Sequence, residues 1–326
     1  MKEKIKKLEK LIKKADKILL INHIRMDPDA FWWLASFYYI LEKIGKNVKA
    51  VNDMLPPENF DFLESSDIIE TDLDIKKFNT DLIISFDAAS LWQLGETYTK
   101  NENIFKEKDF VVIDHHMTNP WFWSINIVND KYSSTCELTF HIIEKIWFTK
   151  YITPKIATLL TAWIHTDTNI FYNQNTSSST LVTAAKLMDL WADFRAPMYN
   201  FFQKATYNKT KLVWIVFDKL QKSDDGKIVW ASITKTDFGK TWTWDEDTSG
   251  IINRLINIEW AEIAFLIHEL WDEVKASFRS KEYSVWDFCA NFWWGWHKLA
   301  AGFRTDKKLK VIEKEIIDKL NCLLYI

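Results

Sequence analysis

Glycine is scarce in this sequence: 7 of its 326 residues are glycine, whereas average usage of about 7% would give roughly 23. Cysteine is also rare, with widely spaced copies at Cys136, Cys289 and Cys322. An odd number without paired spacing excludes a disulfide framework and a thiolate zinc site, and it favours a reducing compartment. No apolar run approaches the length of about 18 residues that a membrane span needs. A membrane-spanning helix is therefore not expected.

An excess of positive charge is missing too, since the formal net charge is −3. We therefore expect no broad surface for long duplex nucleic acid, although a few local cations suffice for a short oligonucleotide or a small nucleotide. The first residues, "KEKIKKLEKLIKK", predict a charged amphipathic helix and not the apolar core of a signal peptide. These properties predict a cytoplasmic protein, and they are compatible with a homodimer.

Clusters of aspartate and histidine follow four apolar runs of the sequence. The runs are "KILLIN", "DLIISF", "FVVI" and "LLTAWIHT", and the clusters that follow them contain His23, Asp27 and Asp29, then Asp87, then Asp114, His115 and His116, and finally Asp167. Such runs are typical of strands that are buried on both faces of a parallel sheet. Ligands of open parallel sheets bind at the carboxyl ends of the strands. We therefore expect the four clusters to meet at one edge of a sheet.

Carboxylates and imidazoles in these numbers predict a site for two metal ions. Hard ligand sets of this kind suit Mn²⁺ or Mg²⁺ better than thiophilic metals. Two such ions about 3.5–4 Å apart can hold the attacking and leaving oxygens of a phosphoryl transfer. Asp87 stands alone after its run and is the candidate for the bridging carboxylate. The alternative is that each aspartate only caps a helix or a loop, but its recurrence after four separate runs favours the metal site.

The same residues resemble the motifs of the DHH phosphoesterases. Asp114-His115-His116 resembles the motif that gives this family its name, and "NHIRMDPDA", "SFDAAS" and "HTDTNIF" resemble its first, second and fourth motifs. Near the end, "SFRSK" and "GWHKLAAGF" resemble the DHH-associated C-terminal domain. Within that family, the overall length and domain content of the chain are most similar to those of the oligoribonucleases that degrade nanoRNA and also dephosphorylate 3′-phosphoadenosine 5′-phosphate.

The resemblance implies a role for each residue of the clusters. One Mn²⁺ ion would be held by His23, Asp27 and Asp87, and a second by Asp29, Asp87, His115 and Asp167, with Mg²⁺ as the other candidate metal. The catalytic residues would be His116, as a donor beside the scissile phosphate, and Asp114, which would orient a neighbouring histidine. Substrate would be bound from the second domain by Ser277, Arg279, Gly295 and His297. A guanidinium suits this task because its fork of donors matches phosphate oxygens.

Tryptophan occupies several positions at which the family pattern has glycine. The sequence contains 18 tryptophans, and those at family glycine positions include Trp32, Trp191, Trp293, Trp294 and Trp296. Glycine lets a backbone approach phosphate closely and adopt positive φ, so indole rings in such a loop would obstruct the substrate. Three explanations are open: a sequence altered or designed on a family scaffold, an imperfectly assigned sequence, or natural divergence of the loops. The first two are favoured because the exchanges share no physical benefit.

The alternation of elements predicts an α/β fold with a doubly wound, mostly parallel sheet, followed by a smaller mixed α/β domain. Apolar spacing and capping residues predict helices over residues 34–44 and 134–148, and the later segments "KIVWASIT", "AEIAFLIHEL" and "EVKASFRS" predict short strands. The length fits two domains. We expect a DHH catalytic domain over residues 1–190, a helical connector over 191–215 and a DHH-associated substrate-binding domain over 216–326.

These expectations combine into a metal-dependent phosphoesterase that hydrolyses short RNA, 3′-phosphoadenosine 5′-phosphate or both by two-metal activation of water. The site would lie in the cleft between the domains, a common position for ligand pockets. Related alternatives are a cyclic-dinucleotide or linear-dinucleotide phosphodiesterase and a family pyrophosphatase, although "SFRSK" argues against the latter. An alternative from another class is a nucleotide-binding protein without turnover, because tryptophan replaces the glycine loop.

Overall fold

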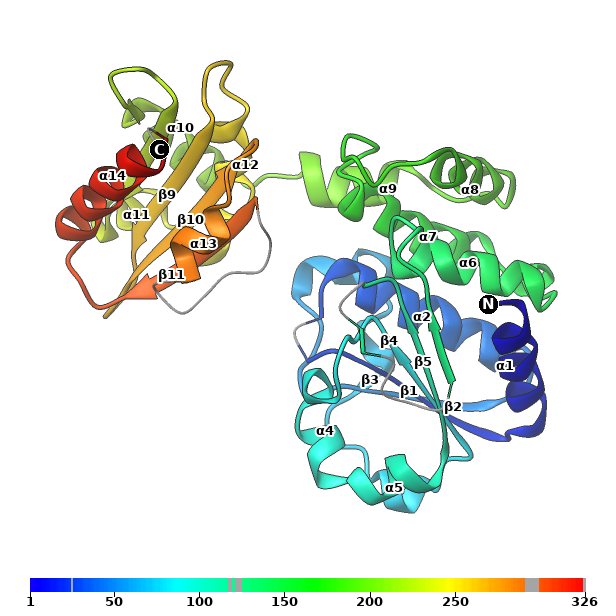
Figure 1. The fold of residues 1–326 in the computed structure, drawn as a ribbon. Coiled ribbons are helices and arrows are strands. Elements are labelled where there is room, and N and C mark those ends of the chain that lie inside the picture. The colour runs from blue at the N-terminus through cyan, green and yellow to red at the C-terminus, as the bar shows by residue number, and fades with distance from the viewer. Residues whose placement is uncertain (25, 117–118, 121–124, 291–298, 325–326) are drawn as a thin grey trace. The chain divides into compact units, whose positions relative to one another are not determined.

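The computed structural model describes residues 1–326 except 25, 117–118, 121–124, 291–298 and 325–326 (Figure 1). The chain divides into two compact units, Met1–Lys204 and Ala205–Ile326. The division falls inside the segment 191–215 that the sequence assigns to a connector. The three-part division itself stays a prediction.

Unit 1 is built on a parallel sheet of six strands. In spatial order the strands are β3 (Ile69–Glu70), β2 (Asn47–Val51), β1 (Lys17–Asn22), β4 (Leu82–Phe86), β5 (Asp109–Asp114) and β6 (Ile125–Val128). Every neighbouring pair is parallel. The central strands are rich in isoleucine, leucine and valine because both of their faces are covered. This arrangement confirms the predicted α/β class.

Helices cover both faces of this sheet, as Figure 1 shows. One face packs against α1 (Lys2–Lys14), α2 (Pro28–Lys43), α6 (Thr135–Lys145) and α7 (Pro154–Asp167), and the other against α3 (Ile75–Phe78), α4 (Gly95–Lys100) and α5 (Glu102–Glu107). Residues of β1 alternate between the two cores: Ile18 and Leu20 face one, and Leu19 and Ile21 face the other. This alternation follows from the two-residue period of a strand.

Short polar side chains define where the helices behind the sheet begin. Asp27 is the N-cap of α2 and accepts a hydrogen bond from the backbone N–H of Ala30. Ser134 caps α6 and Thr153 caps α7 in the same way. Such caps satisfy backbone donors that the first helical turn leaves unpaired. The predicted helices over 34–44 and 134–148 are therefore present with shifted ends.

One predicted strand is a helix. The run "LLTAWIHT" before Asp167 belongs to α7, which starts with Pro154 directly after its N-cap. An apolar run cannot distinguish a buried strand from a buried helix by periodicity. Its capping residue and N-terminal proline are the signals that indicate a helix. The expectation of four strand ends was wrong, and three strand ends and one helix end replace it.

Between α7 and the second unit, turns alternate with short helices. This segment contains α8 (Ser178–Asp189), α9 (Arg195–Met198) and a π-helical turn over Tyr199–Gln203. The next helix, α10 (Tyr207–Asp218), belongs to unit 2. None of the helices in the described part of the chain is long and apolar enough to cross a membrane.

Unit 2 contains a mixed sheet of five strands. In spatial order they are β11 (Ala300–Thr305), β10 (Val274–Ser280), β9 (Ile263–Glu269), β8 (Ile228–Ile233) and β7 (Gln221–Lys222). β8 and β9 are parallel, and the other neighbours are antiparallel. One face packs on α13 (Val285–Ala290) and α14 (Leu309–Leu324), and the other on α10 and α12 (Ile251–Ile256). The predicted smaller mixed α/β unit is confirmed.

Candidate active site

Three neighbouring strands deliver polar side chains to one edge of the unit 1 sheet. β1, β4 and β5 lie side by side and run parallel, so their carboxyl ends meet. His23 directly follows β1, Asp87 directly follows β4, and Asp114 ends β5. Asp87 has a φ of 53°, a left-handed conformation that aspartate tolerates better than most residues. The turn carries its carboxylate into the site, where the residue is only 4% exposed.

Asp87 lies at the centre of the cluster. One of its carboxylate oxygens is 3.7 Å from His23 Nε2, and the other is 3.8 Å from His115 Nε2. His23 Nε2 is also 3.7 Å from Asp27 Oδ1. Asp87 therefore contacts residues that follow both neighbouring strands, the position that a bridging carboxylate requires.

The residues of the cluster fall into overlapping groups with a spacing suited to a metal ion. Within each group the ligand atoms lie within 4.8 Å of one another, and the groups are His23 with Asp27 and Asp87, Asp29 with His115 and Asp167, and Asp87 with His115 and His116. All six residues that the sequence predicts as metal ligands belong to at least one group. The structure thus brings together residues that are up to 144 positions apart, from His23 to Asp167.

Asp29 lies against the N-terminus of α6. Its carboxylate accepts hydrogen bonds from the backbone N–H groups of Thr135 and Cys136 at 3.1 and 3.3 Å. The Thr135 hydroxyl donates to Asp87 Oδ1 at 2.9 Å. Unpaired N–H groups at a helix N-terminus favour negative charge. Thr135 thus orients two carboxylates of the cluster, whereas its sequence pattern indicates only the start of the helix predicted over 134–148.

Burial and charge repulsion perturb the carboxylates. Burial raises the pKa of Asp29 well above its ordinary value, and the charges of Asp167 and Asp87 raise it further. Burial and the charges of Asp27 and Asp87 likewise raise the pKa of Asp167. The pKa of Asp87 is lowered: burial opposes this shift, but a hydrogen bond with His23 and the neighbouring imidazoles outweigh it. The site therefore concentrates more negative charge than its own imidazoles balance.

His23 carries a proton in the absence of other cations. Burial by itself lowers its pKa, but hydrogen bonds to Asp27 and Asp87 outweigh burial and raise the pKa to about 10. His115 differs, because burial dominates and lowers its pKa below the ordinary value. A positive charge is thus favoured next to Asp87.

His116 is held by Asp114. The His116 Nδ1 atom lies 2.8 Å from Asp114 Oδ1, and the backbone N–H of His116 donates to the same oxygen at 3.2 Å. The other Asp114 oxygen accepts from Asn119 Nδ2 at 2.7 Å. The hydrogen bond with Asp114 raises the pKa of His116 to about 9, although burial opposes it. His116 is therefore a protonated donor at neutral pH, with its ring orientation fixed through Nδ1.

Unit 2 contains two of the four predicted substrate residues within the described chain. Ser277 and Arg279 lie on β10. Arg279 Nε donates to Asn253 Oδ1 at 3.1 Å, and one terminal nitrogen donates to the carbonyl of Phe278 at 2.9 Å. Gly295 and His297 lie outside the described residues, as do Trp293, Trp294 and Trp296. Their assignment to substrate stays a prediction.

Two histidines outside the motifs, His165 and His268, lie close to polar groups of their own unit. His165 is buried within α7, and its Nδ1 lies 2.8 Å from the carbonyl oxygen of Thr161. His165 therefore lies inside a helix and not at a strand end. His268 lies on β9 with Nε2 2.8 Å from Asp245 Oδ1, and Lys275 Nζ lies 2.9 Å from the same oxygen.

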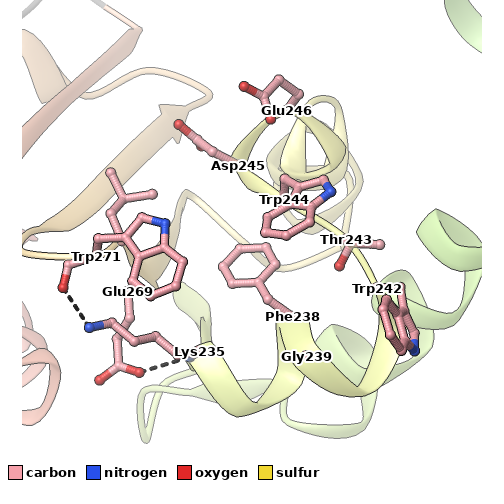
Figure 2. Close-up of a pocket in the computed structure, with 11 residues that line it drawn as sticks. Lys235, Phe238, Gly239, Trp242, Thr243, Trp244, Asp245, Glu246, Glu269 and Trp271 are labelled. Carbon is pink, nitrogen blue, oxygen red and sulfur yellow. Dashed lines mark hydrogen bonds between the residues drawn. The ribbon is translucent and has the colours of Figure 1, made fainter.

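Among the described residues, the lining of a pocket of about 710 Å³ in unit 2 includes neither Ser277 nor Arg279. Figure 2 shows Trp244, Trp271 and Phe238 around it. Lys235 Nζ donates to the carbonyl oxygen of Trp271 at 2.6 Å at its edge. Three of the residues that line the pocket are tryptophans, namely Trp242, Trp244 and Trp271.

Residues 17–164 match the model of the DHH family, N-terminal domain. The matched residues lie within unit 1, which is therefore similar to the N-terminal domain of the DHH family, and the match confirms the resemblance that the motifs carry. Proteins of this family depend on metal ions, and the described residues include groups that could hold them.

Curated relatives extend the similarity over nearly the whole chain. The chain is 27% identical to the bifunctional oligoribonuclease and PAP phosphatase NrnA of Mycoplasma genitalium, over 96% of each protein. It is 26% identical to NrnA of Bacillus subtilis, over 88% of each. A solved structure of an exopolyphosphatase-related protein from Bacteroides fragilis has a TM-score of 0.88 with 21% identity and covers 98% of this chain and 96% of that one. This last likeness shows the fold.

Proposed function

We propose that this chain is a metal-dependent phosphoesterase that hydrolyses short RNA oligonucleotides and 3′-phosphoadenosine 5′-phosphate. The observation that carries the proposal is the convergence of His23, Asp27, Asp29, Asp87, His115 and Asp167 into overlapping groups at one sheet edge. Relatives whose names include both activities are similar over 88% or more of this chain, which supports the substrate class.

The donor set fits two divalent cations. We assign His23, Asp27 and Asp87 to one ion, and Asp29, Asp87, His115 and Asp167 to the other. Carboxylate and imidazole ligands suit Mn²⁺, with Mg²⁺ as the alternative. Asp87 belongs to both sets because it contacts imidazoles on both of its sides.

The electrostatics of the site support this fit. Burial and the charges of neighbouring carboxylates raise the pKa values of Asp29 and Asp167. Hydrogen bonds with Asp27 and Asp87 outweigh burial and raise the pKa of His23, which supports a cation beside Asp87. A group of buried carboxylates is costly unless positive charge balances it. Divalent cations would supply that charge, and His23 would then act as a neutral ligand.

The chain's own residues perform distinct tasks around the phosphate. When bound, two divalent cations supply Lewis-acid charge and lower the pKa of water. His116 donates a proton through Nε2, because Nδ1 is already engaged by Asp114. Its raised pKa keeps that donor charged at neutral pH, which stabilises negative charge that develops on a phosphate oxygen or on the leaving group. Asp114 fixes the ring and is in turn held by Asn119.

Residues of unit 2 would bind the rest of the substrate. We propose Ser277, Arg279, Gly295 and His297 for this role. The Arg279 guanidinium is held by Asn253 through Nε, which limits its motion and leaves a planar group suited to phosphate. A cytoplasmic location and a homodimer stay predictions.

The decisive experiment measures hydrolysis of a labelled RNA dinucleotide and of 3′-phosphoadenosine 5′-phosphate. Each substrate is tested after chelation, with added Mn²⁺ and with added Mg²⁺. We expect turnover of at least one substrate only when a divalent ion is present. A cyclic dinucleotide is tested in parallel, and its preferred cleavage would favour the phosphodiesterase alternative. Metal and substrate binding without turnover would favour the nucleotide-binding alternative and refute the proposal.

A further inference from the structure

Three helices of unit 1 end in the same hydrogen-bonded motif. After α2, Gly45 N–H donates to Glu42 and the next N–H donates to Leu41. After α6, Trp147 N–H donates to Glu144 and the next to Ile143, and α8 ends likewise at Trp191. This pair of bonds defines the motif in which the residue after the C-cap adopts a left-handed conformation. One helix thus has glycine at this position, and two have tryptophan.

The backbone at these positions favours glycine. The φ angles are 80° at Gly45, 62° at Trp147 and 64° at Trp191, and Trp242 has 52° at the end of α11 (Lys235–Thr241). Positive φ is unfavourable for a bulky side chain and costs glycine nothing. No packing compensates for it, because the three tryptophans are 78%, 81% and 79% exposed. Tryptophan is usually a well-buried residue.

Buried tryptophans in unit 1 have a different defect. Trp32 and Trp33 on α2 and Trp163 on α7 are 0% exposed, and none of the described residues accepts a hydrogen bond from their indole N–H groups. A buried indole N–H usually finds a partner, and an unpaired one is destabilising. These indoles therefore bring unpaired polar N–H groups into the core, which glycine at the same positions would not do.

One cause accounts for both observations. The exposed helix ends and the buried core positions share no environment, but glycine would remove both the strained φ and the unpaired N–H groups. The 18 tryptophans and 7 glycines together slightly exceed the roughly 23 glycines that average usage predicts. We propose that the codons written as tryptophan in this chain specify glycine in the organism that makes the protein, so that the native protein carries glycine at these positions.

Peptide mass spectrometry of the protein purified from its source cells tests the proposal. We expect the peptides that contain positions 191 and 242 to have the mass for glycine. Tryptophan at both positions would overturn the proposal. Position 230 is the most stringent test of a single cause for all tryptophans, because the Trp230 side chain has favourable contacts. Its indole stacks on Phe265 with ring centroids 5.5 Å apart, and its N–H donates to Glu313 at 2.9 Å. Tryptophan there with glycine at 191 and 242 would overturn the single-codon cause and indicate local alteration.

Recombinant variants test the structural argument independently. We expect Trp147→Gly and Trp191→Gly each to raise Tm by roughly 2–4 °C, the change that a modest stabilisation produces in a domain of this size. The matched control is Trp214→Gly on α10, a position that is 73% exposed and has ordinary helical φ. Glycine inside a helix is unfavourable, so this variant should have a lower Tm. A decrease in Tm for all three variants would refute the argument from the helix ends.

Discussion

Replacing Asp87 by asparagine should separate metal binding from folding. Asparagine preserves the shape of the side chain and tolerates the left-handed backbone at this position, where φ is 53°. Its amide oxygen can still accept the hydrogen bond that the Thr135 hydroxyl donates. The change therefore removes one negative charge and little else, and that charge is the one shared by both proposed ion sites.

The expected rise in Tm follows from the binding free energy. A ligand that binds the folded state stabilises it by about 2.7 kcal/mol per site at a concentration 100 times its Kd. In a domain of this size each kcal/mol raises Tm by roughly 2–4 °C. Asp87→Asn should lose this Mn²⁺-induced rise in Tm. After chelation its Tm should change little, because lost contact with His23 is offset by weaker repulsion of Asp29 and Asp167. Loss of a single hydrogen-bond donor lowers turnover by about 10²–10³-fold. Turnover of Asp87→Asn should fall by more than this.

The assay combines thermal unfolding with and without Mn²⁺, metal content by mass spectrometry and turnover of the RNA dinucleotide. Asp72→Asn is the matched control, since Asp72 is exposed and outside the cluster. Its Tm shift, metal content and turnover should equal those of the unmodified chain. Full metal content and an unchanged Mn²⁺-induced shift in Asp87→Asn would refute the bridging role.

Three further predictions follow from the geometry. His116→Ala should lower kcat by about 10²–10³-fold while metal content stays unchanged, and loss of metal would show that its role is ligation. Asp245→Asn should lower the free energy of unfolding at pH 7 by about 1–3 kcal/mol. The hydrogen bond with His268 lowers the pKa of Asp245. The difference in unfolding free energy should therefore shrink below about pH 4, where the carboxylate begins to take up a proton. A difference that chemical denaturation shows to be independent of pH would contradict this prediction. Gly95→Ala should lower the free energy of unfolding by more than about 1 kcal/mol, because a Cβ there would clash with the carboxylate of Asp53. Gly239→Ala, where a Cβ would meet nothing within 4 Å, should not lower it in the same chemical denaturation measurement.

The residue types and order of the site were accessible from the sequence. Three apolar runs predict β1, β4 and β5, because strands buried on both faces need continuous apolar side chains. Since parallel strands end at one edge, the polar residues after them, such as His23, Asp87 and His115, had to lie near one another. The prediction of an α/β fold with a second mixed unit rests on the same local patterns and is confirmed.

The tertiary structure decided what local patterns leave open. The run before Asp167 is a helix, because its cap and first proline outweigh an apolar pattern that suits either element. The contact between Asp29 and the N-terminus of α6 joins residues 106 positions apart, and only packing of α2 beside α6 creates it. The pairing of Asp114 with His116, the positive φ of Asp87 and the pKa shifts likewise depend on burial and on neighbours distant in sequence. The sequence determined which groups are present, and the folded chain determined which of them share charge, protons and orientation.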